Sequence, residues 1–278
     1  MTAPTTPASS PREGRLFAGL QMDRPEPFSF GGGRAALFTA AAPGRAADAN
    51  EDALGVFPAS GGRGVLAVAD GLGGQPAGAS ASRRALRALQ DAIQAAPPEA
   101  PSLRGALLDG LERASQEIRA VGSGAATTLV AAELDGDLLR PVHVGDSAML
   151  VVGQRGRVKL QTIAHSPVGY AVEAGLLDER EALHHADRHI VSNAVGMADM
   201  RIEVGAVLRL APRDTLLLAS DGLFDNLLLD EIIEGVRRGP LLACAESLAR
   251  TAQQRMAHGE RGRPGKPDDV TFILFRLG

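Results

Sequence analysis

The sequence predicts an α+β fold in which antiparallel sheets carry packed helices. Strand-like and helix-like segments come in blocks along the chain, whereas a parallel doubly wound sheet would alternate them strictly. Short β-rich runs at 127–134, 138–144 and 148–152 are joined by Asp135-Gly136 and Gly145-Asp146-Ser147, which is typical of an antiparallel meander.

The chain begins with residues 1–32, which are rich in Pro, Thr, Ser and Gly and which we expect to be a flexible leader. Predicted strands follow at 35–42, 53–57 and 65–69. The last of these is a short apolar run bounded by glycines, as expected for a buried strand.

Two helical patterns follow these strands, at 78–96 and 102–121. In the first, Leu86, Leu89 and Ile93 are spaced i, i+3 and i+7, so they lie on one face of a helix. After the meander comes a region with little strand signal, residues 161–200, which holds a short helical pattern at 171–177. The C-terminal part then predicts a strand, two helices and a strand, at 215–219, around 229–236, around 241–252 and at 270–275.

Composition excludes several function classes. The formal net charge is −4 and aromatic residues make up only 3% of the chain, so we expect no nucleic-acid partner. No apolar run approaches the ~18 residues of a membrane span. The first residues carry no secretory signal pattern, so we expect a cytoplasmic protein without a membrane partner. The single cysteine, Cys244, lies in a helical pattern and is expected to be a structural thiol.

The chemistry of the sequence is concentrated in acidic residues at strand ends. The predicted strand at 65–69 runs directly into Asp70 and Gly71. A carboxylate at the end of a buried strand is costly unless something pairs with it. Asp70 therefore either caps the following helix or holds a cation.

Other acidic clusters repeat this arrangement. They are Glu51-Asp52, Asp221-Gly222 with Asp225, Asp268-Asp269 and, in a turn, Asp146. Converging carboxylates repel one another unless cations neutralise them, and oxygen-only ligands select hard ions such as Mg²⁺ or Mn²⁺. Two such ions about 3.5–4 Å apart can share a water and clamp an in-line displacement at phosphorus.

Taken one at a time, several of these residues have simpler explanations. An Asp beside Gly is usually a turn residue, which is the better explanation for Asp146, Asp225 and Asp269 considered alone. His165 alone would be a hydrogen-bonded histidine, and Arg188 alone a solvated charge. A dinucleotide-binding turn at Gly71-Leu72-Gly73-Gly74 fails, because the last glycine of that motif falls on Pro76.

Eight segments in one order resemble the metal-dependent, type 2C Ser/Thr protein phosphatase family, and specifically its bacterial members. They are residues 50–52, 69–74, 126–128, 144–147, 164–166, 189–196, 220–225 and 268–271. Leu72 replaces the usual Met of the Asp-Gly-Met-Gly-Gly segment.

The resemblance implies a four-layer αββα sandwich, with two antiparallel sheets face to face and a helix pair on each outer side. It assigns residues 33–278 to the phosphatase domain and about 165–189 to a flap that influences substrate choice. It implies direct hydrolysis of phosphoserine and phosphothreonine by a metal-bridging hydroxide. The substrates would be phosphorylated proteins, and the enzyme would oppose a Ser/Thr kinase.

The resemblance also assigns ligands for two Mn²⁺ or Mg²⁺ ions. Asp70 should bridge both ions and, with Asp221 and Asp268, form the catalytic set and the first site. Glu51 and the Gly71 carbonyl should complete the second site. A third, weaker site would be formed by Asp146 and Asp225 together with Asp221.

Two positions depart from the family pattern. The Arg that usually binds the substrate phosphate is replaced by Ala47, and the Arg that usually follows Gly-Asp-Ser by Ala148. We expect Arg45 to bind phosphate in its place. The loss also motivates an alternative, a weakly active or inactive phosphoprotein-binding module of the same fold; a small-molecule phosphatase is a third possibility.

Overall fold

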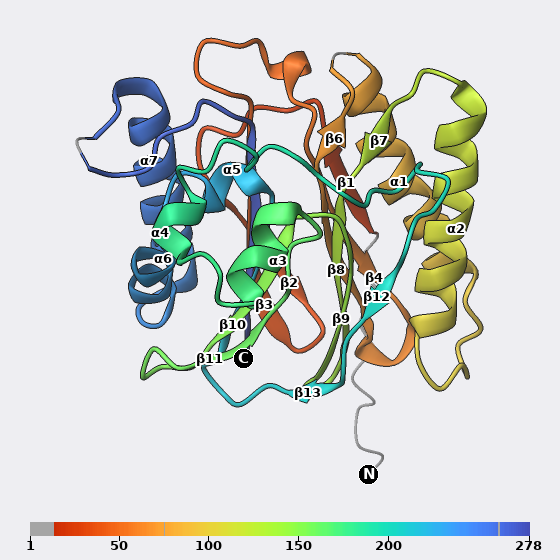
Figure 1. Ribbon diagram of the computed structural model, residues 1–278. Coiled ribbons are helices and arrows are strands. Elements are labelled where there is room, and N and C mark those ends of the chain that lie inside the picture. Colours follow the sequence, from red (N-terminus) through yellow and green to blue (C-terminus); the bar gives the residue numbers. More distant parts are fainter. Residues whose placement is uncertain (1–13, 75, 261) are drawn as a thin grey trace.

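The computed structural model describes residues 14–74, 76–260 and 262–278. Two antiparallel sheets pack face to face, and a pair of helices covers the outer face of each (Figure 1). The predicted α+β class and the four-layer αββα arrangement are therefore confirmed.

Both large sheets are antiparallel throughout. In spatial order the first contains β1 (Arg15–Ala18), β4 (Ala53–Pro58), β5 (Gly64–Ala69), β8 (Leu129–Asp135), β9 (Leu138–Val144) and β12 (Glu203–Val204), with β13 (Leu208–Arg209) also on β9. The second contains β11 (Val158–Gln161), β10 (Ala148–Val152), β14 (Thr215–Ala219), β15 (Val270–Leu277), β3 (Gly33–Ala40) and β2 (Glu26–Phe30). A small ribbon joins β6 (Gly71–Leu72) to β7 (Ala126–Thr127).

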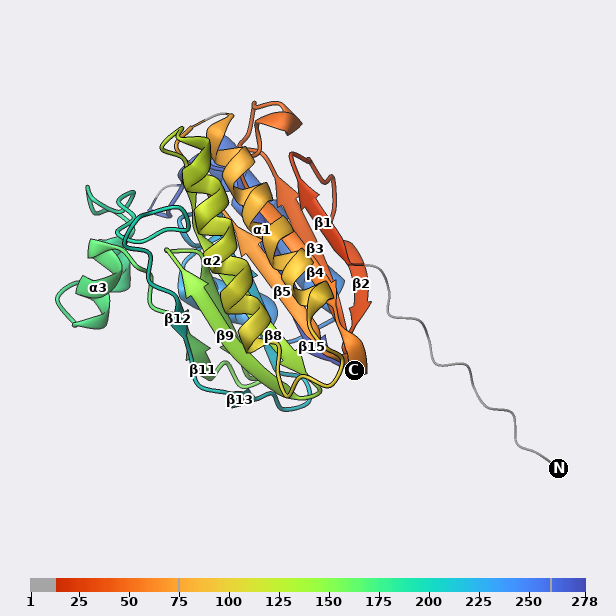
Figure 2. The same ribbon diagram turned by 90° about the vertical axis from the view of Figure 1, so that its right-hand side faces the viewer.

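The helices divide between the two outer faces. Helices α1 (Ala77–Ala95) and α2 (Arg104–Val121) lie on the first sheet, as Figure 2 shows, and α6 (Leu229–Val236) and α7 (Leu241–His258) lie on the second. The remaining helices are short: α3 (Pro167–Glu173), α4 (Glu179–Ala182), α5 (Asp221–Phe224) and two 3₁₀ turns, Ala47–Ala49 and Ser60–Gly62.

Three apolar clusters separate the four layers. One lies between the sheets and contains Leu54, Leu66, Leu218 and Phe275 among its buried members. The other two fill the space between each sheet and its helix pair. Strands in both sheets are therefore buried on both faces, which is why 65–69 and 215–219 are near-continuous apolar runs.

The expectation that residues 1–32 form a flexible leader is wrong for part of this segment. Residues 15–18 and 26–30 are strands: β1 pairs with β4, and β2 pairs with β3. The physical reason is the alternation in β2, where Phe28 and Phe30 are buried and the residues between and before them are exposed. Residues 1–13 of the expected leader lie outside the described residues.

The helical pattern expected at 171–177 is displaced toward the N-terminus. Helix α3 starts at Pro167, and the Ser166 hydroxyl caps it by accepting the Gly169 N–H at 2.9 Å. Proline is well suited to the first helical turn, because its missing N–H would have no partner there. The Ser-Pro pair was therefore the better signal for the start of this helix.

The register of the strands brings the acidic segments to one end of the sandwich. In the first sheet Ala53 pairs with Ala69, so the residues just before β4 and just after β5 lie together. In the second sheet Ala219 pairs with Phe272, and Val270 pairs with Ala40. Residues 51–52, 70–71, 220–221 and 268–269 thus meet at one end of the molecule.

A buried arginine ties the end of α7 to the start of α6. The Arg255 guanidinium donates two parallel hydrogen bonds to Glu231, at 2.7 and 2.8 Å, and a third to the Asn226 carbonyl at 3.0 Å. These charged hydrogen bonds from Arg255 lower the pKa of Glu231 to about 2. Because this pKa lies below the ordinary 4.5, the stabilisation is present above that pH and is lost as the pH falls toward 2.

We expect Glu231→Gln to lower the free energy of unfolding at neutral pH by about 1.5–3 kcal/mol, the contribution of charged hydrogen bonds. The difference from the unsubstituted chain should shrink between pH 4.5 and 2, measured by urea unfolding across that range. Glu234→Gln, which removes a pair with Arg237 at an exposed position, is the matched control and should cost much less. A pH-independent difference would contradict the assignment.

Candidate active site

The backbone of Asp70 is fixed by two threonines. The carbonyl of Asp70 accepts hydrogen bonds from the Thr127 hydroxyl at 2.7 Å and from the Thr128 N–H at 2.8 Å. The Thr128 hydroxyl lies 2.6 Å from that of Ser147. Asp70 does not cap α1, whose N-cap position is Pro76 without a side-chain hydrogen bond. Of the two roles open to Asp70, holding a cation is the one the structure favours.

The carboxyl group of Glu51 lies against Gly78, at a point where Gly71 and Gly78 approach each other closely. A Cβ on Gly78 would lie 2.3 Å from Glu51 Oε1, and a Cβ on Gly71 would lie 2.3 Å from the Gly78 carbonyl. Among the described residues, Glu51 Oε1 is a buried side-chain oxygen with no hydrogen-bond partner. A buried carboxylate oxygen left in this way is costly without a cation, so Glu51 fits the role of a metal ligand.

Two neighbouring acids hold the backbone. Asp269 accepts hydrogen bonds from the N–H groups of Ala42 and Glu51, at 2.8 and 2.7 Å. Asp52 is buried and accepts one from the Ser220 hydroxyl at 2.8 Å. In each acidic pair, one residue faces the centre and the other fixes the segment. The resemblance assigns Glu51 and not Asp52 to a metal site, and the structure gives Asp52 the second of these roles.

The pKa values record how closely the carboxylates converge. Burial raises the pKa of Asp70 most, and charge repulsion raises it further, first from Asp52 and then from Asp221, Asp146 and Asp268. Burial, and then the charge of Asp221, raises the pKa of Asp146 to about 7. Carboxylates that hinder one another's ionisation in this way favour bound cations, which stabilise the charged forms.

Lys266 lies among these carboxylates, and sequence reasoning did not predict it. Its ammonium is 3.0 Å from Asp221 Oδ2, 3.0 Å from Asp225 Oδ2 and 2.8 Å from Asp268 Oδ2. Burial alone would lower the pKa of Lys266, but the three carboxylates raise it above its ordinary value, so the side chain is charged. A lysine two residues before Asp268 was the available signal.

Arg45 reaches the edge of the same centre. Its guanidinium lies 3.5 Å from Glu51 Oε2 and 3.6 Å from Asp269 Oδ1. Ala47, at the position where the family usually has Arg, begins a 3₁₀ turn that directs the chain toward Asn50. The guanidinium is partly exposed, so it remains accessible to a ligand at the centre.

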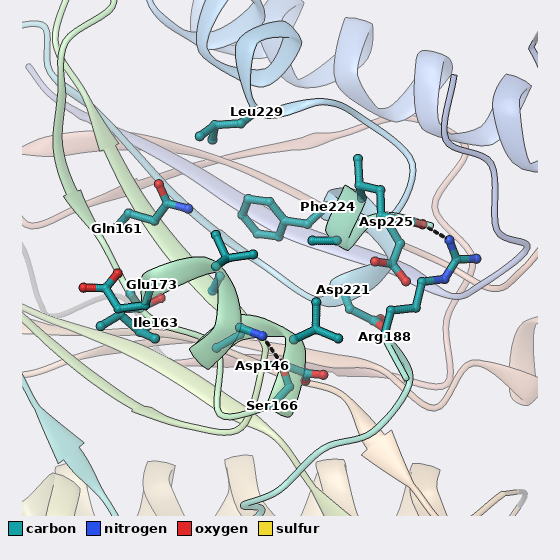
Figure 3. Close-up of a pocket in the computed structure, with 18 of the residues that line it drawn as sticks. Asp146, Gln161, Ile163, Ser166, Glu173, Arg188, Asp221, Phe224, Asp225 and Leu229 are labelled. Atoms are coloured by element: carbon teal, nitrogen blue, oxygen red, sulfur yellow. Dashed lines mark hydrogen bonds between the residues drawn. The ribbon is translucent and has the colours of Figure 1, made fainter. Parts of the chain in front are cut away.

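A pocket of about 520 Å³ opens from one side of the centre. Asp146, Asp221 and Asp225 line one part of it, and residues of the segment 164–188 line another (Figure 3). Phe224 and Leu229 add apolar surface. The part of the chain expected to be a flap thus borders a pocket that also contains the acids expected at a third metal site.

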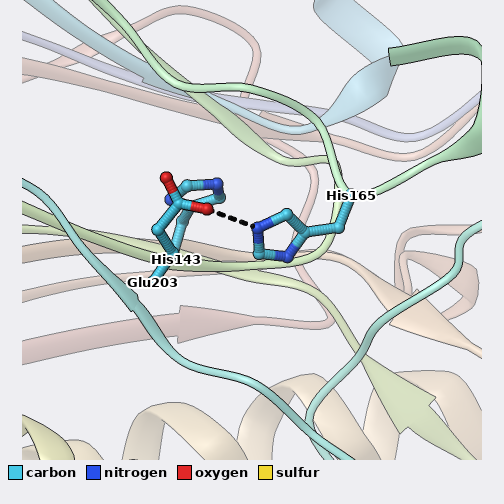
Figure 4. Close-up of side chains that lie close together, drawn as sticks. All are labelled: His143, His165 and Glu203. Atoms are coloured by element: carbon cyan, nitrogen blue, oxygen red, sulfur yellow. Dashed lines mark hydrogen bonds and ion pairs between the residues drawn. The ribbon is translucent and has the colours of Figure 1, made fainter. Parts of the chain in front are cut away.

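A second cluster joins His143, His165 and Glu203, whose potential ligand atoms lie within 4.8 Å of one another (Figure 4). His165 Nδ1 accepts hydrogen bonds from the Gly145 N–H at 3.1 Å and the Asn193 amide at 2.8 Å. The ring proton must then lie on Nε2, which donates to Glu203 at 3.1 Å. A protonated nitrogen cannot bind a metal. We therefore interpret this cluster as a set of structural hydrogen bonds that fixes the start of the segment 165–189.

Comparison with known proteins agrees with this geometry. The family model for protein phosphatase 2C matches residues 45–258. The protein phosphatase PhpP of Streptococcus pneumoniae is 32% identical over 238 residues, which cover 82% of this chain and 92% of that protein. The S. agalactiae serine/threonine phosphatase structure has a TM-score of 0.75 and 29% identity, covering 88% of this chain and 99% of that chain.

A further solved structure is the catalytic domain of the serine threonine protein phosphatase PstP in complex with two manganese ions. It has a TM-score of 0.68 and 27% identity, and covers 88% of this chain and 97% of that chain. Because the family model matches most of the sequence, this chain belongs to the protein phosphatase 2C family.

We expect Asp70→Asn to weaken Mn²⁺ binding by more than roughly 100-fold. Loss of a residue that only hydrogen-bonds a metal ligand already weakens binding by roughly 10- to 100-fold. The substitution keeps the shape of the side chain and removes its charge from the middle of the centre. Asp221→Asn should act likewise, and Asp146→Asn more mildly. Isothermal titration with Mn²⁺ measures the effect, and Asp135→Asn, at the exposed end of β8, is the control. Normal affinity in Asp70→Asn would contradict the ligand assignment.

Proposed function

We propose that this chain is a divalent-metal-dependent protein phosphatase that hydrolyses phosphoserine and phosphothreonine in proteins. The observation that carries the proposal is the convergence of carboxylates from several strand ends on Asp70, beside a buried Glu51 oxygen that has no hydrogen-bond partner among the described residues. The relatives named serine/threonine phosphatases support the substrate class.

The residues present fit two Mn²⁺ or Mg²⁺ ions. Asp70, Asp221 and Asp268 would hold the first, and Asp70 with Glu51 and the Gly71 carbonyl the second. When bound, such ions supply Lewis acidity that activates water and neutralises charge as a phosphate ester is cleaved. Manganese is supported by the PstP structure, which is a complex with two manganese ions.

The chain's own residues position the substrate. Arg45 has the charge and the two parallel N–H groups to bind a phosphate dianion at the edge of the centre. The thiol of Cys244 lies buried on α7 and donates to the Arg238 carbonyl at 3.0 Å, so it is no nucleophile. His165 keeps its Nδ1 engaged by two donors and holds its proton against Glu203, so it is no general base.

The pocket beside the centre would receive residues that flank the phosphorylated side chain. Residues 165–189 form part of its wall, with Arg180 and Arg188 among the lining side chains. These cations would favour acidic residues near the phosphorylation site. We therefore propose that this segment acts as the flap and influences peptide preference.

The proposal places the enzyme in the cytoplasm, where it would reverse the action of a Ser/Thr kinase on shared protein substrates. Among the described residues, no helix has the length and apolar character to cross a bilayer. The alternative of an inactive phosphoprotein-binding module is not favoured, because a candidate is present for every core metal-ligand position and Arg45 lies beside Glu51.

We expect a phosphothreonine peptide to be hydrolysed with Mn²⁺ and not in excess chelator. Ca²⁺ should support less activity, because it prefers larger and looser coordination than these carboxylates offer. Phosphate release measured across the three conditions tests this, with an unphosphorylated peptide as blank. Binding of the phosphopeptide without turnover would favour the inactive module, and full activity in chelator would exclude the metal-dependent mechanism.

We expect Arg45→Ala to raise the KM for a phosphopeptide about ten- to a hundredfold, since a charge-assisted hydrogen bond contributes roughly 1.5–3 kcal/mol. Arg45→Lys should retain part of the binding, because lysine keeps the positive charge. It should not retain all of it, because lysine lacks the parallel pair of N–H donors. Steady-state kinetics measure the effect, and Arg34→Ala, at an exposed position in β3, is the control. An unchanged KM and kcat would remove Arg45 from the phosphate site.

A further inference from the structure

The ammonium of Lys266 lies where the carboxylates of two expected metal sites meet. Asp221 and Asp268 belong to the expected first site, whereas Asp225 belongs to the expected third site alone. All three lie within 3.0 Å of Lys266 Nζ, and each contributes its Oδ2 atom. The Oδ1 atom of Asp268 accepts the Asp269 N–H at 2.9 Å and, like the Oδ1 atom of Asp221, keeps a lone pair for a metal at the first site.

The lysine is held in place by its own backbone. The Asn226 side chain accepts the Lys266 N–H at 2.8 Å and donates to the Lys266 carbonyl at 2.9 Å. Asn226 is fully buried, and its carbonyl accepts a hydrogen bond from Arg255 at 3.0 Å. Pro267 further restricts the chain between the lysine and Asp268. This positioning distinguishes Lys266 from a flexible surface lysine that meets an acid by chance.

We infer that Lys266 is a resident cation of the centre and takes the place of the third divalent ion, so that the loaded enzyme binds two ions. The inference rests on the proposed function for the identity of the metal centre. An ammonium held against Asp221 and Asp225 satisfies the carboxylates that a third ion would need, and its charge repels a divalent ion from them. Asp146 alone is then too few ligands for a third ion.

The consequence is a centre that needs no loosely bound metal. One positive charge is covalently attached on the side of the centre that borders the pocket, and it stays there at any metal concentration. The protein without metal also keeps three of its converging carboxylates partly neutralised. Stability without metal and metal stoichiometry should therefore both depend on Lys266.

The test is the number of Mn²⁺ ions bound at saturation, measured by equilibrium dialysis and elemental analysis without substrate. We expect two ions for the unsubstituted chain and three for Lys266→Met, which keeps the length of the side chain and removes its charge. Lys266→Arg, which keeps the charge, should bind two. Lys159→Met is the matched control, because Lys159 also pairs with an acid, Asp214 at 2.6 Å, outside the centre.

A second readout is thermal unfolding in chelator and in Mn²⁺. Lys266→Met should unfold at a lower temperature than the unsubstituted chain in chelator and should gain more from Mn²⁺. Three ions in the unsubstituted chain would overturn the inference, whether or not the variant folds. A stoichiometry of two ions in Lys266→Met would also overturn the inference. If those two ions bound more tightly than in the unsubstituted chain, the lysine would be a competitor of the first ion.

These outcomes are separate from failure of the proposed function. A chain that binds two Mn²⁺ ions, gains a third in Lys266→Met and hydrolyses no phosphopeptide would uphold the inference about Lys266. It would contradict only the assignment of phosphatase activity. A phosphatase that binds three ions would uphold the proposed function and overturn the role of the lysine.

Discussion

Repulsion among converging carboxylates is the constraint on which the rest of this structure depends. Antiparallel pairing brings the residues beside β4, β5, β14 and β15 to one end of the sandwich, and acidic residues stand at each of these strand ends. Burial and mutual repulsion raise the pKa of Asp70 well above its ordinary value, so the centre favours cations. Cations then stabilise an arrangement that repulsion among the carboxylates would otherwise oppose.

The same acids that create the repulsion also join the two sheets. Asp269, beside β15 of one sheet, binds the N–H of Glu51, which precedes β4 of the other. Ser220, after β14, donates to Asp52, so a second buried hydrogen bond crosses in the same region. Because these bonds link the sheets at the centre, the packing of the sandwich and the position of the ligands are parts of one arrangement. The three apolar clusters supply most of the burial, and the polar bonds fix how the sheets meet.

Sequence patterns predicted those parts of the fold that rest on local periodicity. The apolar runs at 65–69 and 215–219 and the amphipathic segments of α1 and α2 follow from rules of spacing that need no tertiary information. The strands at 15–18 and 26–30 were missed because their Pro- and Gly-rich surroundings suggest a flexible segment, while the alternation of Phe28 and Phe30 covers only a few residues. Lys266 was missed for another reason. It stands two residues before Asp268, but its place in the centre depends on Asn226, which is 40 residues away in the sequence.

The positive charges of the centre come from different positions than in the family pattern. Ala47 and Ala148 stand where the pattern usually has arginine, whereas Arg45 and Lys266 approach the carboxylates from other positions. Arg45 contacts Glu51 and Asp269 near the second expected ion, and Lys266 contacts Asp221, Asp225 and Asp268 around the first and third. A charge attached to the chain cannot be diluted or chelated, so part of the neutralisation that metals would otherwise provide is built into the sequence. Because the acids are brought together by strand register and the cations by side-chain anchors such as Asn226, the two sets of charge can change independently.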